Sequence, residues 1–257
     1  VAPETLERVG SIRGVASVRE ILRPVVAREA TGAASGPRAT SVCGVARSEG
    51  DSQLRADLAR AGLGIDGTGV TVGIISDSFD VDPEAPTRAA QDVASGDLPG
   101  PGNPCGRTTP VEVLADSSEG GLDEGRAMAQ IIHDLAPGAR LQFVSVPLGQ
   151  FEFADTVRAL ADGGADVIVD DIGFLDDAFF QDGPITTAID EVVGEGVAYF
   201  TAAGNDNLMV GNKDVASFEE GSFRPASCPV FDVGFGPPAV CHDFDAGVGV
   251  DTGAGFT

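Results

Sequence analysis

The sequence lacks several features that would point to common classes of protein. No uninterrupted apolar run approaches the roughly 18 residues that a membrane-spanning helix needs. The four cysteines form no CxxC pair, so we do not expect a zinc site built from paired cysteines. Basic residues are scarce, with 16 Lys and Arg against 40 Asp and Glu and a net charge of −24. Such an acidic chain is not expected to bind nucleic acid or anionic membranes.

The composition is otherwise that of a globular protein. With 257 residues, 42% of them hydrophobic, the chain can bury a core in one large domain or two modest ones. The opening residues VAPETLERVG do not have the basic-then-apolar plan of a signal peptide. Two cysteines flank a short loop, which suits a Cys228–Cys241 disulfide and leaves Cys43–Cys105 as the second pair. An even number of loop cysteines predicts an extracellular, secreted protein.

Apolar β-branched runs alternate with helical patterns in the middle of the chain. Runs typical of buried parallel strands lie at 70–76, 141–146, 166–172 and 197–203. Between them, helices are expected at about 122–135, 153–165 and 184–196. This order predicts an α/β fold with a doubly wound parallel sheet between two helical layers, a three-layer αβα arrangement.

The rest of the chain has weaker patterns. Residues 1–44 are interpreted as an N-terminal extension or prosegment remnant, and 45–205 as the α/β domain. Within that domain, residues 81–118 are rich in Pro, Gly and Asp and predict a long loop. Residues 206–257 are short pieces punctuated by Gly and Pro, which indicates an irregular or β-rich segment.

Polar residues stand directly after three of the expected strands. Asp77 follows the first strand, Asp170 and Asp171 close another, and Gly204-Asn205 follows the last. Each aspartate taken singly could be a turn former or a helix cap. Ligands of open α/β sheets bind beyond the carboxyl ends of the strands, so these groups together predict a functional site on one rim.

Glu124 opens the helix expected at 122–135. At about 100° per residue, Met128, Ile131 and Leu135 lie within about 40° of Glu124 around the helix. Its carboxylate therefore lies at the N-terminal end of an apolar helix face that we expect to be buried. Glu124 could alternatively be an ordinary first-turn acid favoured by the helix N-terminus. His133 is nine positions on, about 180° around the helix, and is expected to point away as a last-turn histidine favoured by the helix dipole.

Four stretches of the chain, in this order, resemble the subtilisin-like serine peptidases over about residues 45–205. They are DGTGVTVGIISDSFD, EGRAMAQIIHDLAPGA, DVIVDDIGF and VAYFTAAGN. They are similar, in turn, to the strand with the catalytic Asp, the helix that begins with the catalytic His, the substrate-binding strand and the strand ending in the oxyanion Asn. The resemblance implies a subtilisin-like fold and a serine endopeptidase that acts on polypeptides.

The resemblance also implies roles for individual residues. Asp77 is the acid of the triad and Asn205 the side-chain donor of the oxyanion hole. The implied substrate-binding residues are Asp170, Asp171, Gly173 and Gly204, with Gly173 at the wall of the first specificity pocket and Asp171 beside the substrate backbone.

The position of the catalytic His holds Glu124 instead. This departure is similar to the sedolisins, relatives with a Ser-Glu-Asp triad that act in acid. Their second acid, one turn along the same helix, corresponds to Met128, so the sedolisin pattern is incomplete. The string EGGLD at 119–123 resembles the sedolisin Glu-x-x-Leu-Asp motif but lies too far from the helix exit to be that motif. The resemblance therefore implies an acid-shifted peptidase with Glu124 as base and Asp77 as its partner.

The nucleophile of the family stands in a Gly-Thr-Ser stretch at the start of a later helix. Nothing after Asn205 fits this pattern, since Gly221-Ser222 is set in sequence without helical periodicity. We expect the nucleophile to lie outside this chain, with the rest of the catalytic domain missing from it, and the chain alone to be inactive. The alternative is a pseudo-peptidase, a protein-binding module that keeps the sheet and has lost the reaction.

Two other functions fit the sequence less well. Asp77 and Asp80 after a buried strand would suit Mg²⁺ and phosphoryl transfer, but no phosphate loop or partner lysine accompanies them. GIDGTG precedes its strand, whereas a dinucleotide-binding fingerprint follows one. No cofactor is required by the proposed chemistry, no metal site is predicted, and a structural Ca²⁺ is not indicated. The sequence leaves the oligomeric state open.

Overall fold

The computed structural model describes residues 43–146, 149–174, 177, 181–204, 222–227, 240–243 and 247–250, and only the backbone of 25–26, 209–210 and 213–214. Its helices are α2 (Gly50–Gln53), α3 (Ala56–Leu63), α4 (Ala89–Ser95), α5 (Glu124–Leu135), α6 (Gln150–Asp162) and α7 (Pro184–Gly194). The strands of the central sheet are β2 (Thr71–Ser76), β3 (Glu112–Ala115), β4 (Arg140–Ser145), β5 (Val167–Asp170) and β7 (Ala198–Thr201). Among the described helices, none combines the length and apolar character that crossing a bilayer requires.

The five central strands are all parallel, in the order β3-β4-β2-β5-β7. Helices flank the sheet, so the α/β class predicted from the alternating pattern is confirmed. β2 lies at the centre and is buried along nearly its whole length, as expected of an apolar run in a parallel sheet. Its neighbours are in register, with Ser76 opposite Ser145 of β4 and Ile75 opposite Asp170 of β5.

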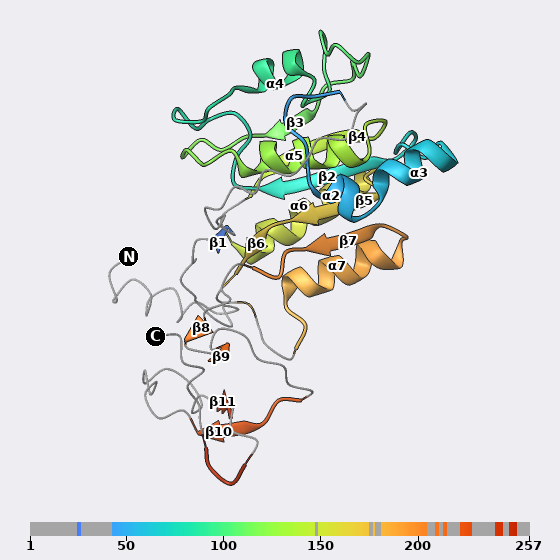
Figure 1. Ribbon diagram of the computed structural model, residues 1–257. Coiled ribbons are helices and arrows are strands. Elements are labelled where there is room, and N and C mark those ends of the chain that lie inside the picture. The colour runs from blue at the N-terminus through green and yellow to red at the C-terminus, as the bar shows by residue number, and fades with distance from the viewer. Residues whose placement is uncertain are drawn as a thin grey trace.

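The two faces of the sheet carry separate cores. Ile75 and Ile168 face α6 and α7, whereas Val72, Ile74 and Phe143 face α5. Figure 1 shows α5 on one side of β2 and α7 on the other. The close approach of α6 depends on Gly73 of β2, since a Cβ there would lie 3.1 Å from Cδ1 of Leu160.

The position of α5 follows from an unusual chain path. The crossovers β3-α5-β4, β4-α6-β5 and β5-α7-β7 all move across the sheet in the same direction. Because α5 covers the face opposite to α6 and α7, its crossover has the opposite hand. Crossovers of parallel strands share the right hand in about 98% of cases, so a sheet that mixes hands is rare. This path sets the first turn of α5 beside the end of β2.

The long loop expected at 81–118 is not structureless, and this part of the prediction is wrong. It contains α4 and the edge strand β3. β3 is a short strand, Glu-Val-Leu-Ala, and all four of its residues are exposed although three are apolar. The Cys43–Cys105 disulfide predicted from the sequence is present and ties this region to the segment before α2.

Short antiparallel pairs lie outside the main sheet. β1 (Val25–Val26) pairs with β6 (Ile172–Gly173). In the C-terminal segment, β8 (Met209–Val210) pairs with β9 (Lys213–Asp214), and β10 (Pro225–Ser227) pairs with β11 (Val240–His242). The described parts of that segment thus contain strands and no helix. The expected Cys228–Cys241 pair includes a residue outside the described part of the chain, and the domain boundaries at 44 and 205 stay predictions.

Candidate active site at the carboxyl edge of the sheet

Asp77 follows β2 and its carboxylate reaches the start of α5. Oδ1 accepts hydrogen bonds from the backbone N–H of Ser78 at 2.5 Å and of Glu124 at 2.9 Å, and Oδ2 accepts one from the N–H of Leu122 at 2.5 Å. The first N–H groups of a helix have no partner within it, and a negative charge there is favoured by the helix dipole. Asp77 therefore caps α5 from a neighbouring strand and joins the tip of β2 to Glu124.

The start of α5 is held by unusually close packing. Asp123, the residue before the helix, has a φ of +56°, in the left-handed region that non-glycine residues seldom occupy. A Cβ on Gly125 would collide with the ring of Phe143 and the carbonyl of Ser78. Together these features seat the first turn directly on the sheet and leave the Glu124 side chain half-buried at its edge.

The stripe expected on α5 is displaced around the helix. Ile131 is 48% exposed, and the buried residues are Gly125, Arg126, Ala129, His133 and Asp134. The prediction that Met128, Ile131 and Leu135 form the buried stripe is therefore wrong for Ile131. The polar residues Arg126, His133 and Asp134 are buried as well, which the apolar pattern of the helix does not predict.

Arg126 is the centre of a buried ion cluster that the sequence did not reveal. Its Nε donates to the carbonyl of Phe79 at 2.8 Å, Nη1 to Asp92 at 2.5 Å and Nη2 to Asp123 at 2.8 Å. The Arg126 side chain is 5% exposed and the two carboxylates less. Asp123 and Arg126 are three residues apart, a spacing at which two side chains of a helix can pair. The sequence contains this spacing, but it predicts an ion pair only when the helix is known to begin beside Asp123.

Asp123 links this cluster to the loop after β2. Its Oδ1 accepts hydrogen bonds from the N–H groups of Val81 and Asp82 and from the Ser78 hydroxyl. Burial by itself raises the pKa of Asp123, but these donors and Arg126 outweigh it and hold the pKa below its usual range. The loop, α4 and the first turn of α5 are thereby fixed to one another around the site.

Asp170 is the last residue of β5, and its carboxylate accepts hydrogen bonds from other groups of the protein. It accepts hydrogen bonds from the Tyr199 hydroxyl at 2.6 Å, the Thr201 hydroxyl at 2.9 Å and the N–H of Ile172 at 3.0 Å. Burial raises its pKa, against the effect of these three donors. Because both oxygens are used within the protein, the geometry favours a positioning function for Asp170 over direct contact with a substrate.

Asp171 brings a second carboxylate towards Asp77. Its Oδ2 accepts a hydrogen bond from the Ser76 hydroxyl at 3.1 Å, and Oδ1 is buried without a hydrogen-bond partner among the described residues. Burial, opposed by the Ser76 bond and reinforced by the negative charges of Asp77 and Asp170, raises the pKa of Asp171 to about 6. The rim of the sheet can therefore hold a carboxyl proton in mildly acidic solution.

This raised pKa makes stability depend on pH in a defined direction. Between the unfolded pKa of about 3.9 and the folded value of about 6, the folded state binds more protons, so stability falls as pH rises through that window. We expect Asp171→Asn to be more stable than the parent at pH 7 by about 2 kcal/mol, a value reduced for partial exposure, and equal to it near pH 4. Urea unfolding at both pH values measures the difference.

Asp155→Asn is the matched control, because that carboxylate is exposed on α6. It should leave the unfolding curve unchanged at both pH values. A constant difference between Asp171→Asn and the parent from pH 4 to pH 7 would show that Asp171 does not hold a raised pKa.

The remaining predicted site residues are only partly described. Gly173 lies in β6, opposite Val25. Gly204 is exposed with a φ of +82°, which favours glycine at this turn after β7. Asn205 and Gly221 lie outside the described residues, and Ser222 is exposed three residues before β10. Within the described ranges, no group of three or more His, Cys, Asp or Glu side chains is arranged to hold a metal ion.

Comparison with known proteins gives only loose likenesses. No protein-family model and no curated protein sequence matches the chain. Among solved structures, it is similar to the prenylagaramide maturation protease PagA, with 19% identity, a TM-score of 0.38 and coverage of 62% of this chain and 52% of that one. It is also similar to MycP1, a serine protease that is an essential component of the type VII (ESX-1) secretion system, with 16% identity, a TM-score of 0.35 and coverage of 73% and 52%. The chain thus spans about half the length of these structures, and the functional assignment rests on the site.

Proposed function

We propose that this chain carries part of the active site of a serine endopeptidase of the subtilisin/sedolisin type, with Glu124 as the base and Asp77 as its acidic partner. The proposal assigns no nucleophilic serine for the Ser-Glu-Asp triad among the described residues. The observation that carries the proposal is the hydrogen bond of 2.9 Å between the Asp77 carboxylate and the backbone N–H of Glu124. It joins the end of β2 to the first residue of α5, so the two acids stand on adjoining segments at one edge of the sheet, which supports the proposal.

A serine hydroxyl needs a base to take its proton, and the strength of that base sets the working pH. Glutamate has an ordinary pKa of about 4.3, so it accepts protons best in acid or where neighbouring carboxylates raise that value. At this rim, burial raises the pKa of the Asp171 carboxyl to about 6, which supports the proposal of acidic chemistry here. Proton transfer through Glu124 therefore supports a peptidase that works below neutral pH.

The other groups complete the proposal. Asn205, directly after the Gly204 turn, would donate its side-chain amide to the oxyanion of the tetrahedral intermediate. Asp171 and Gly173, with Gly204, would border the bound polypeptide, and Asp170 would hold the ends of β5 and β7 in place. The chemistry requires no metal or cofactor. The Cys43–Cys105 disulfide supports secretion, since such bonds persist in oxidising surroundings.

The test is hydrolysis of a denatured protein substrate by the complete protein that contains this chain, measured from about pH 3 to about pH 9. We expect a maximum in acid and labelling of one serine by a fluorophosphonate. A rate that peaks above about pH 8 would contradict Glu124 as the base. If no serine is labelled at about pH 4 or pH 7, the protein is a pseudo-peptidase that keeps the sheet as a binding module.

A further inference from the structure

The N-terminal extension reaches the candidate active site through one strand. β1 runs antiparallel to β6, with Val25 opposite Gly173. β6 directly follows Asp171, so this pairing lies at the carboxyl edge of the sheet (Figure 1). Among the described strands, β1 is the only one that pairs with β6. A segment distant in sequence therefore uses the main-chain pairing of the strand whose residues the resemblance assigns to substrate binding.

The carboxyl edge of the sheet is strongly acidic. Three described segments meet there, at residues 77–84, 116–124 and 170–174. Together they contain ten Asp and Glu and no Lys or Arg. Arg88 and Arg126 offset two of these acids, Asp80 and Asp123. Within the described part of the chain, the edge thus carries an excess of negative charge around β6.

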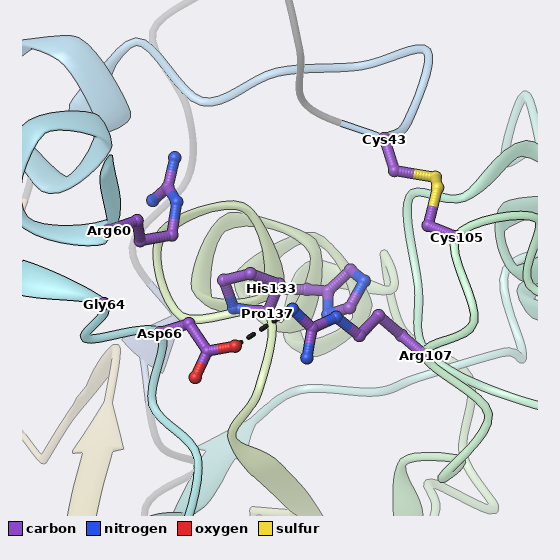
Figure 2. Close-up of a pocket in the computed structure, with 8 residues that line it drawn as sticks. All are labelled: Cys43, Arg60, Gly64, Asp66, Cys105, Arg107, His133 and Pro137. Atoms are coloured by element: carbon purple, nitrogen blue, oxygen red, sulfur yellow. Dashed lines mark hydrogen bonds and ion pairs between the residues drawn. A yellow bond between two sulfur atoms is a disulfide. The ribbon is translucent and has the colours of Figure 1, made fainter. Parts of the chain in front are cut away.

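The arginines at the opposite edge of the sheet are already paired with acids. Arg60 and Arg107 line a pocket there (Figure 2). Nη2 of Arg107 lies 3.0 Å from Oδ2 of Asp66, and Nη1 of Arg60 lies 2.7 Å from Oδ1 of Asp51. The six residues of β2 separate the two edges by about 20 Å, which is more than two Debye lengths at physiological ionic strength. Neither arginine therefore offsets the acids of the carboxyl edge.

His133, which is buried beside this pocket, adds no positive charge at neutral pH. Burial lowers its pKa to about 4, with a further contribution from the positive charge of Arg107 and against the negative charge of Asp97. The interpretation from sequence, a last-turn histidine favoured by the helix dipole, is therefore wrong, because desolvation outweighs the dipole. The acidic edge gains no counter-charge from this side of the sheet.

The N-terminal extension is a basic part of an acidic chain. Residues 1–44 contain six Arg and four Glu, whereas the rest of the chain contains ten Lys and Arg against 36 Asp and Glu. β1 belongs to the run RPVVAR, residues 23–28, which has two Arg and no acid. A basic extended segment beside an acidic edge gains electrostatic attraction in addition to main-chain hydrogen bonds. Charge and strand pairing thus favour the same occupant of β6.

We propose that the candidate active site takes arginine-containing extended polypeptides as an antiparallel strand on β6, and that the run RPVVAR occupies this place within the chain. The extension then competes with the substrate and has to leave β6 before a substrate can pair there. The inference rests on the proposed peptidase for its substrate, but pairing and displacement require no catalysis. It adds a substrate class, namely segments with arginine on both sides of a short apolar stretch.

The first test uses the full chain, isotope-labelled, and an unlabelled peptide RPVVAR with both ends capped. The readout is hydrogen exchange of backbone amides, followed by NMR. Saturating peptide is expected to make the amides of Val25 and Val26 exchange about tenfold faster, because β1 loses its partner. The amide of Gly173 should stay protected, since the peptide takes the place of β1. About tenfold more of the control peptide EPVVAE should be needed, because its charges are repelled by the edge.

The second test changes the extension itself. Arg23→Glu combined with Arg28→Glu is expected to make the amide of Gly173 exchange about tenfold faster than in the parent, because β1 leaves β6 more often. The difference should shrink at about 0.5 M NaCl, where attraction between exposed charges is screened. The matched control is Arg8→Glu combined with Arg13→Glu, which makes the same charge change in the extension outside the run RPVVAR. It should leave exchange of Gly173 as in the parent.

Hydrolysis by the complete protein separates this inference from the proposed function. The peptide RPVVAR should inhibit competitively, and Arg23→Glu combined with Arg28→Glu should raise kcat/KM. If the complete protein hydrolyses nothing while the peptide displaces β1, the peptidase proposal fails and the strand site stands. The inference is overturned if RPVVAR leaves the exchange of Val25 and Val26 unchanged or if EPVVAE displaces β1 equally well. Equal effects of the two double variants would also overturn it.

Discussion

Replacing Glu124 with Gln is expected to lower peptide hydrolysis by the complete protein about 100- to 10,000-fold, the usual contribution of a positioned general base. The change removes the ability to accept a proton and leaves the side chain nearly the same size. The hydrogen bond to Asp77 is made by the backbone N–H of residue 124, so the amide does not disturb it. We therefore expect kcat to fall with little change in KM or in the unfolding midpoint, measured by steady-state kinetics and urea unfolding.

Glu152→Gln is the matched control, since Glu152 occupies the first turn of α6 and is exposed. It removes the same charge from the first turn of another helix and should leave hydrolysis unchanged. Full activity in Glu124→Gln would show that another group is the base and that Glu124 is a first-turn acid. Equal losses in both variants would indicate a general effect of net charge instead of proton transfer.

Replacing Arg126 with Met is expected to destabilise the protein by about 3–5 kcal/mol at pH 7. The variant keeps the apolar stem but leaves Asp92 and Asp123 buried without their counter-charge, and leaves the carbonyl of Phe79 without this donor. The contribution of Asp123, whose pKa is lowered in the folded state, is present above its unfolded pKa of about 3.9 and lost as pH falls. The difference between parent and variant should therefore narrow in acid, as urea unfolding at several pH values would show.

Arg158→Met is the comparison, because it removes an arginine whose ion pairs are exposed, and it should leave the unfolding midpoint unchanged. Adding Asp92→Asn and Asp123→Asn to Arg126→Met should recover part of the stability by removing the uncompensated charges. A loss in Arg126→Met no larger than in Arg158→Met would mean that the cluster contributes little to holding α5 on the sheet.

The candidate site was predictable because it depends on strand ends. In a parallel sheet, residues that follow the strands meet at one edge, so Asp77, Asp170 and Asp171 were assigned to a common rim without knowledge of the strand order. Glu124 was placed there by helix periodicity. Its backbone contact with Asp77 was not predictable, because the angle at which a helix meets a strand depends on packing between segments distant in sequence.

What the sequence alone determined is therefore the class of fold, the buried central strands and the acids at their ends, all of which follow from local periodicity. The tertiary structure decided which face α5 covers, that an exposed edge strand joins the sheet, and that Arg126 and His133 are buried. These features depend on contacts across the chain, such as that of Arg126 with Asp92. The physical reason is that burial of a charged or titratable side chain is set by the partners that surround it, and the residue's own neighbours in sequence do not specify them.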